Sequence, residues 1–116
     1  MKIAFPTNGK DLEAEMFLHF GRCNNYLIYD TENKSFEIIK NTSEHMGGKG
    51  LPPELIKKNG ANIMIVADLG KRALQLFSKL DIEVYCKAEG EIQDVLDKFH
   101  QGKLEKANKD IICQVH

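Results

Sequence analysis

The chain has 116 residues, of which 42% are hydrophobic and 28% charged, as in an ordinary globular protein. A chain of this length can bury a hydrophobic core as one domain. Its formal net charge is −1 and it carries no basic block, so we expect no nucleic-acid partner. The longest apolar run, residues 63–67, is far too short to cross a bilayer, so we expect no membrane partner.

Cysteine usage and the first residues predict a compartment. The three cysteines, Cys23, Cys86 and Cys113, are odd in number and include no C-x-x-C spacing. One chain therefore cannot assemble a zinc ribbon or a four-cysteine ferredoxin site. A strand-like segment follows Met1 and Lys2 directly, which leaves no room for a signal peptide. We expect a cytoplasmic protein with reduced thiols.

The first third of the chain predicts three strands. Residues 3–5 form a short apolar run that Pro6 is expected to end, which is typical of a buried strand. Residues 26–29 and 35–39 are rich in aromatic and β-branched side chains and flank the polar residues 30–34. This spacing predicts a β-hairpin.

The remaining elements alternate between helices and strands. Residues 51–60 place prolines where a first helical turn tolerates them and a glycine where a helix stops. The uniformly apolar residues 63–67 predict a strand covered on both faces, and residues 82–86 predict another strand. Apolar side chains at helical spacing predict amphipathic helices over residues 73–80 and 92–99.

The element order predicts an α/β layer fold with right-handed crossovers. We assign residues 1–102 to one domain and residues 103–116 to a loosely attached tail, with room for a short edge segment at its end. We expect the second strand to run antiparallel to the first, and the helical crossovers to keep the fourth and fifth strands parallel to the first. Residues 19–23 and 45–50 then lie at the same edge of the sheet as the carboxyl ends of the first, fourth and fifth strands. Open α/β sheets bind ligands at that edge. We therefore expect the functional site there.

Two segments at this edge contain metal-binding side chains beside glycines and cations. His19, Cys23 and His45 are candidate metal ligands of borderline or soft character. The same segments hold candidate donors of hydrogen bonds to anionic sulfur, namely Arg22, Gly47, Gly48, Lys49 and Gly50. This combination suits a metal centre with negative charge, such as a sulfide-bridged cluster.

These residues also have structural interpretations, and that of His45 is a place in a solvated loop. His19 can order the loop that enters the second strand, and Cys23 can be a small buried hydrophobic residue. Arg22 can pair with an acidic neighbour, and the glycines can serve turn geometry alone.

With these segments in place, the chain resembles the dinitrogenase iron-molybdenum cofactor biosynthesis family, whose small stand-alone members are related to nitrogenase accessory proteins that carry cofactor precursors. The resemblance covers roughly residues 1–102. It rests on Met1-Lys2-Ile3-Ala4-Phe5-Pro6, His19-Phe20-Gly21-Arg22, Asn41 leading into Gly47-Gly48-Lys49-Gly50, Gly70-Lys71-Arg72-Ala73-Leu74 and Ile82-Glu83-Val84-Tyr85.

The resemblance implies a ribonuclease-H-like three-layer fold, with a five-stranded mixed sheet in the order 3-2-1-4-5 and helices on both faces. It also implies a non-catalytic carrier or assembly protein for an iron–sulfur or molybdenum–iron–sulfur cluster. Partners would then be the cluster itself and the proteins that donate and accept it. By position, the histidine of the family motif is His19 and the glycine-rich loop is residues 47–50.

Two other functions fit the same scaffold. The chain can be an interaction module that binds no cluster. A metal-dependent nuclease of ribonuclease-H-like fold would need several clustered carboxylates to hold two divalent ions. Residues 2–5 carry no acid, and Asp68 alone cannot hold such a pair. We therefore expect no enzymatic activity.

Overall fold

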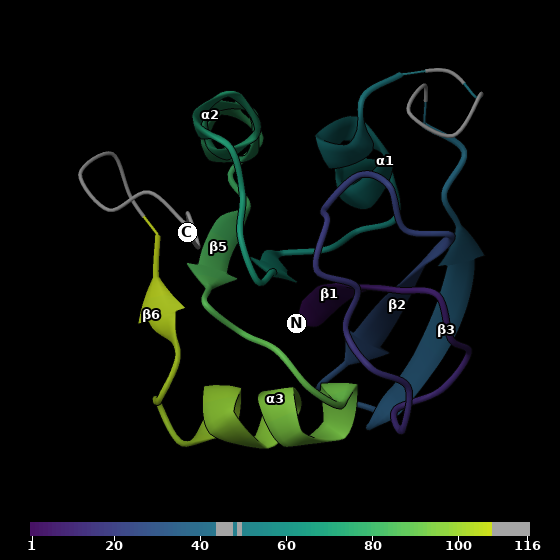
Figure 1. Cartoon of the computed structure of the whole chain (residues 1–116), viewed down its shortest axis with the longest axis vertical. Coiled ribbons are helices and arrows are strands. Elements are labelled where there is room, and N and C mark those ends of the chain that lie inside the picture. Colours follow the sequence, from purple (N-terminus) through teal and green to yellow (C-terminus); the bar gives the residue numbers. More distant parts are fainter. Residues whose placement is uncertain (44–47, 49, 108–116) are drawn as a thin grey trace.

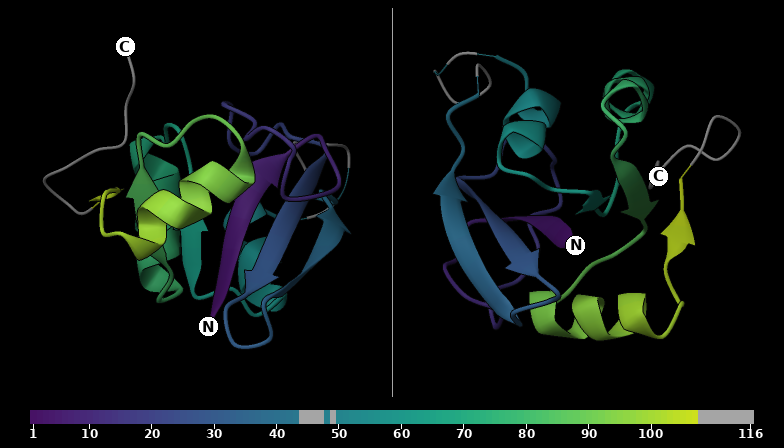
Figure 2. Two further views of the ribbon diagram at one scale, coloured as in Figure 1. Left: turned by 90° about the horizontal axis from the view of Figure 1, so that it is seen from below. Right: turned by 180° about the vertical axis from the view of Figure 1, so that it is seen from behind.

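The computed structural model describes residues 1–43, 48 and 50–107. In Figure 1 a mixed sheet lies between α1 and α2 on one face and α3 on the other. Figure 2 shows the same three layers from behind. The elements are β1 (Lys2–Thr7), β2 (Asn25–Asp30), β3 (Ser35–Lys40), α1 (Pro52–Lys58), β4 (Ile63–Ile65), α2 (Lys71–Lys79), β5 (Glu83–Cys86), α3 (Ile92–His100) and β6 (Glu105–Lys106).

Within the described residues the sheet has six strands in the order β3-β2-β1-β4-β5-β6, so the prediction of five strands is wrong by one edge strand. The order of the first five strands is as predicted. β6 pairs antiparallel with β5, and beyond it the Ala107 N–H donates to the Val84 carbonyl at 2.8 Å. The first residues of the expected tail thus belong to the sheet, while residues 108–116 lie outside the described residues.

The strand directions are those predicted from the sequence. β2 is antiparallel to both β1 and β3, whereas β4 is parallel to β1 and β5 to β4. One edge of the sheet, here called the carboxyl edge, therefore collects the ends of β1, β3, β4 and β5 and the start of β2. Residues 19–23 and the segment that follows β3 both lie there.

Pro6 does not end β1 as predicted, because the strand continues to Thr7. Pro6 stands opposite Tyr26 in the antiparallel ladder, and its carbonyl accepts a hydrogen bond from the Phe17 N–H at 2.8 Å. Pairing with β4 involves only Ile3 and Ala4. A missing N–H at position 6 therefore costs the parallel ladder nothing.

The core has two halves because side chains alternate across the sheet. Ala4, Tyr26 and Phe77 belong to the half under α1 and α2. Phe5 and Leu96 belong to the half beneath α3, between this helix and the sheet. Among the described residues, no helix is long and apolar enough to cross a membrane.

Candidate functional site

The long segment between β1 and β2, residues 8–24, crosses the carboxyl edge from one core half to the other. Leu12 and Met16 pack into the half beneath α3. Phe17 and Phe20 pack into the half beneath α1 and α2. The segment is therefore anchored on both faces of the sheet at the edge where we expect the site.

Hydrogen bonds at the base of this segment close it into a loop. The Thr7 hydroxyl donates to the Glu15 carbonyl at 2.9 Å and accepts from the Gly9 N–H at 3.0 Å. The Asn24 N–H donates to the Asn8 side-chain oxygen at 2.7 Å, which joins the beginning of the loop to its end. Buried Thr7 thus holds the loop on the end of β1.

The His19-Phe20-Gly21-Arg22 motif forms a tight turn. The Arg22 N–H donates to the His19 carbonyl at 3.2 Å. Gly21 has a φ of 90°, a backbone conformation that only glycine adopts readily at the third position of such a turn. The turn brings its first and last residues close together, and the side chains of both His19 and Arg22 are exposed.

Phe20 fastens this turn to the core. Its ring centroid lies 6.0 Å from that of Tyr26 on β2 and 5.4 Å from that of Phe77 on α2. Aromatic pairs at these separations are mutually stabilising. The apolar residue of the motif therefore points inward while its histidine and arginine remain at the surface.

Asn41 joins the two sequence segments from which the site was predicted. Its side-chain amide donates to the carbonyls of Gly21 and Cys23, each at 2.9 Å. Its side-chain oxygen accepts from the Ser43 N–H at 3.1 Å and the Ser43 hydroxyl at 2.6 Å. Because Asn41 is buried, these bonds are shielded from competing water. The His19–Cys23 turn and the start of the glycine-rich segment thus form one structural unit.

The described glycines of that segment meet backbone requirements. The Gly48 N–H donates to the Ser43 carbonyl at 2.9 Å, and a Cβ at Gly48 would overlap the Thr42 backbone. Gly50 has a φ of 81° just before α1. Both glycines are exposed. The backbone conformation alone therefore accounts for both glycines.

Cys23 is buried, with no measurable exposure to solvent. Burial raises the pKa of its thiol, an effect that the Tyr26 hydroxyl and the backbone of Thr7 and Gly21 partly offset. Burial likewise raises the pKa of Tyr26, and the nearby Cys23 adds to that increase. Burial therefore disfavours the thiolate form of Cys23, and this residue shares no surface with the exposed His19.

The predicted site residues are distributed as follows. His19, Arg22, Gly48 and Gly50 are exposed and lie at the carboxyl edge, whereas His45, Gly47 and Lys49 lie outside the described residues. Within the described ranges, no three His, Cys, Asp or Glu side chains are grouped to hold a metal ion. In the same part of the chain, no ion pair with an acidic neighbour involves Arg22.

Sequence reasoning did not anticipate the roles of Asn41, Phe20 and Tyr26. Asn41 entered only as part of the resemblance, although an asparagine directly after a strand is a recognisable signal of a side chain that binds loop backbone. The contacts of Phe20 and Tyr26 carried no such signal, since they depend on residues distant in sequence.

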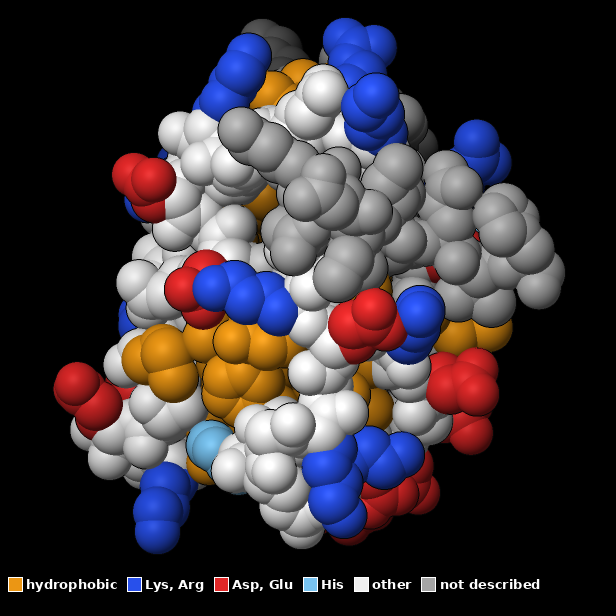
Figure 3. Space-filling model, turned by 90° about the vertical axis from the view of Figure 1, so that its left-hand side faces the viewer, with side chains coloured by type: hydrophobic (Ala, Val, Ile, Leu, Met, Phe, Trp, Pro, Cys, Tyr) orange, Lys and Arg blue, Asp and Glu red, His pale blue; other side chains and the backbone are white. Residues whose placement is uncertain are grey.

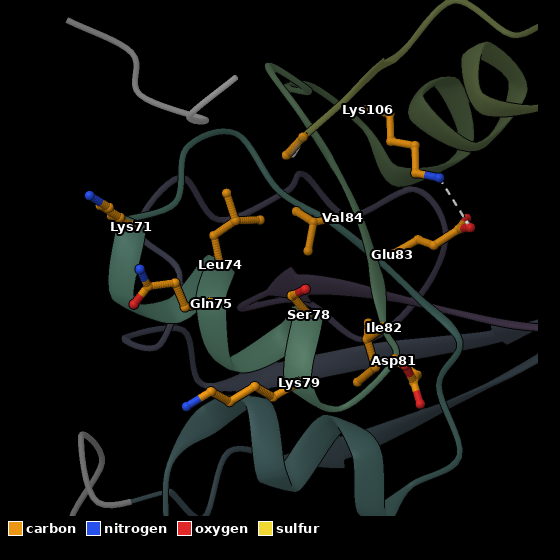
Figure 4. Close-up of a pocket in the computed structure, with 11 residues that line it drawn as sticks. Lys71, Leu74, Gln75, Ser78, Lys79, Asp81, Ile82, Glu83, Val84 and Lys106 are labelled. Carbon is orange, nitrogen blue, oxygen red and sulfur yellow. Dashed lines mark hydrogen bonds and ion pairs between the residues drawn. The ribbon is translucent and has the colours of Figure 1, made fainter. Parts of the chain in front are cut away.

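A groove lies on another flank of the molecule, between α2 and the β5–β6 edge (Figure 4). It has a volume of about 980 Å³. Its lining consists of Lys71, Leu74, Gln75, Ser78, Lys79, Asp81, Ile82, Glu83, Val84, Lys106 and Ala107. Figure 3 shows this flank, where hydrophobic side chains reach the surface among charged ones. The predicted site residues that the structure describes, His19, Arg22, Cys23, Gly48 and Gly50, are not among those that line the groove.

Comparison with known proteins identifies the family. The sequence matches the family described as dinitrogenase iron-molybdenum cofactor over residues 1–102. The chain belongs to this family. The match confirms the resemblance and covers the turn, Asn41 and the glycine-rich segment.

Individual relatives extend over nearly the whole chain. An uncharacterized protein of Methanocaldococcus jannaschii is 39% identical over 111 residues, 91% of each chain. The apo form of the orange protein of Desulfovibrio gigas superposes with a TM-score of 0.83 at 22% identity, over 91% of this chain and 92% of that one, which shows a shared fold. A putative NifB protein from Thermotoga has a TM-score of 0.73 and 26% identity, over 90% of this chain and 91% of its own.

Proposed function

We propose that the protein is a non-catalytic carrier that binds a preformed iron–sulfur or molybdenum–iron–sulfur cluster reversibly at the carboxyl edge. The observation that carries this proposal is the Asn41 side chain, which unites the His19–Cys23 turn with the segment leading to the glycines. Membership of the dinitrogenase iron-molybdenum cofactor family supports the class of cargo.

The residues at this edge suit an anionic metal–sulfur cargo. His19 would bond to metal through its imidazole, and His45 would do so from the segment outside the described residues. Arg22 and Lys49 would face the sulfides, together with backbone N–H groups of the glycine segment. The N–H of Gly48 already bonds to Ser43, so Gly48 contributes close approach instead of a donor.

The surrounding charge favours the same cargo. α2 begins at the carboxyl edge with the exposed cations Lys71 and Arg72, and its first turn contains no acidic residue. The positive end of the helix dipole there adds to the field of the two cations. Because a preformed cluster arrives with its own sulfides, two or three protein ligands suffice to hold it and permit its release.

Several features of this proposal come from the family resemblance. They are the ribonuclease-H-like classification of the fold and exchange of the cluster with donor and acceptor proteins, and the family match over residues 1–102 supports them. A cytoplasmic location is proposed instead from the odd number of cysteines and the absence of a disulfide framework spacing.

Anaerobic titration with tetrathiomolybdate, and separately with an iron–sulfide cluster assembled from ferrous iron and sulfide, tests the proposal. We expect saturable binding that His19→Ala and Arg22→Gln each weaken at least tenfold, with the Arg22 effect shrinking as salt rises. Lys98→Gln, in the last turn of α3 on the opposite face, is the matched charge control. Equal binding by all four proteins would overturn the site, and no binding by the unaltered chain would favour a cluster-free interaction module.

A further inference from the structure

The groove between α2 and the β5–β6 edge continues the hydrophobic core out to the flank of the molecule. Its apolar lining consists of Leu74, Ile82, Val84 and Ala107, and all four belong to the core half under α1 and α2. In Figure 4 the side chains of Leu74 and Val84 lie between the helix and the strand. An apolar occupant of the groove would therefore extend this core and remove its edge from water.

The charges along the groove have both signs. Three lysines, Lys71, Lys79 and Lys106, line it together with Asp81 and Glu83. The Lys106 ammonium and the Glu83 carboxylate form an ion pair at 3.2 Å. Charges mixed in this way create no strong field of one sign, so they do not select a nucleic acid or an acidic peptide. The groove suits an apolar segment that carries few charges.

The described chain leaves the sheet at this groove. Ala107 lines the groove, and its N–H donates to the Val84 carbonyl at 2.8 Å. The next two N–H groups toward the start of β5, those of Glu83 and Ile82, already donate to other carbonyls at 3.0 and 2.9 Å. These two groups therefore cannot extend the ladder to the residues that follow Ala107. The groove is the surface that adjoins those residues.

The sequence after Ala107 supplies an apolar segment that can reach the whole groove. Residues 108–116, which lie outside the described residues, include Ile111, Ile112 and Val115 and one charge of each sign. The two isoleucines stand four and five residues beyond Ala107, a reach of about 13–18 Å for an extended chain. The nine residues of α2 span about 13 Å. Either isoleucine can therefore meet any part of the groove.

We propose that residues 108–116 fold back over the groove and cover it, with Ile111 and Ile112 on its apolar lining. Attachment through β6 favours this occupant over a separate molecule, because a tethered segment meets its site at an effective concentration on the order of millimolar. Burial of the two isoleucines supplies the driving force. The covered flank and the short β6 are then shielded from pairing with another copy of the chain. This inference is independent of the proposed function.

Hydrogen–deuterium exchange of the full-length chain, reduced and dilute, tests this docking. We expect the amides of residues 110–115 to exchange at least tenfold more slowly than those of the double variant Ile111→Ser/Ile112→Ser, because docking shields them from solvent. Each rate is first divided by the intrinsic exchange rate of its own sequence. Circular dichroism checks that the double variant keeps its fold.

A substitution in the groove tests where the segment docks. Ser78 is exposed on α2 and lines the groove. Ser78→Lys keeps a good helix former at this position and brings a charge to the apolar lining. We expect it to reduce the protection of residues 110–115 at least threefold. Ser35→Lys, on exposed β3 at the far edge of the sheet, is the matched control and should leave that protection unchanged.

Protection that is independent of protein concentration, lost in the double isoleucine variant and weakened by Ser78→Lys would support the inference. Exchange of residues 110–115 at the rate of an unstructured peptide would overturn it, and so would protection that Ser78→Lys leaves intact. Protection that grows with protein concentration would also overturn it, since a second copy of the chain would then occupy the groove.

Discussion

Asn41 determines how the two loops of the carboxyl edge are held together. Its amide donates two hydrogen bonds and its side-chain oxygen accepts two, all within a buried environment. An aspartate of the same shape would lose both donors and place a negative oxygen against two carbonyls. The residue thus links stability directly to the geometry of the proposed site.

We expect Asn41→Asp to destabilise the protein by about 2–4 kcal/mol, because two buried acceptors lose their partner and a carboxylate becomes buried. Thr42→Ala, at the exposed neighbouring position, should change the free energy of unfolding by no more than about 0.5 kcal/mol. Urea unfolding measures this free energy for both variants, and the amide chemical shifts of residues 19–24 report on the conformation of the turn. Equal unfolding midpoints for the two variants would show that Asn41 does not hold the edge.

Side-chain direction was the part of the site that sequence predicted least well. Connectivity predicted that His19 and Cys23 lie at the carboxyl edge, as they do, and the turn exposes His19 and Arg22. Cys23 is buried in the core half that also holds Tyr26 and against which Phe20 packs, a cluster that joins a loop to a strand. The spacing of residues along the chain does not predict such contacts. The ligand roles of His19, Cys23 and His45 therefore stay predictions.

At the scale of elements, the β2–β3 hairpin shows how local chemistry produces structure. The Asp30 carboxylate accepts from the Glu32 N–H at 2.9 Å, and the Asn33 side-chain amide donates to it at 3.2 Å. Lys34 then completes the turn with a φ of 55°. The hairpin was predictable because its turn residues and its β-branched strands are adjacent in sequence.

These bonds predict a pH dependence. The Glu32 N–H, followed by that of Asn33, lowers the pKa of Asp30 below its ordinary value of 3.8. Because the folded-state pKa is the lower one, the stabilising contribution is complete above the ordinary value and disappears as pH falls through the folded-state value. Asp30→Asn should therefore lose less stability than the unaltered chain on acidification below about pH 4.

Carboxyl chemical shifts measured by NMR over an acid titration give the pKa of Asp30 directly. Exposed Asp94 on α3 serves as a reference carboxyl in the same spectra. Titration of Asp30 at or above 3.8 would contradict the hydrogen-bonding account of the turn.

Element boundaries were less predictable than the elements themselves. β1 continues through Pro6 because its pairing with β4 has already ended at Ala4. α2 begins at Lys71, before the first apolar residue of its periodic pattern, because Gly70 adopts the N-cap position. Both limits depend on neighbours in space or on capping, which periodicity does not record.

At the scale of the whole molecule, strand direction predicts which edge of the sheet holds the candidate site. One antiparallel hairpin and two helical crossovers suffice to bring the turn, the segment after β3 and the start of α2 to one edge. This convergence was predictable because handedness and direction follow from element order alone. The sixth strand was not predictable, since its two residues are too few to show the alternation of apolar and polar side chains that indicates a strand.

β6 also bears on where the domain ends. The family match stops at residue 102, yet three later residues continue the sheet through Ala107. Lys87 and Glu105 form an ion pair at 2.8 Å, and Lys106 and Glu83 form another at 3.2 Å. Such exposed pairs contribute little, so the stabilising effect of β6 comes chiefly from backbone pairing and from covering the β5 edge.

A chain ending at Gly102 should therefore be less stable than one ending at Ala107, by about 1–3 kcal/mol, since it loses the buried Ala107 and half-buried Leu104. It should also associate with itself more readily, because β5 would become an unprotected edge strand. Urea unfolding and sedimentation of the two truncated chains, compared with the full chain, measure both effects. Identical midpoints for the two truncations would mean that residues 1–102 form the complete folding unit and that β6 is only an attachment.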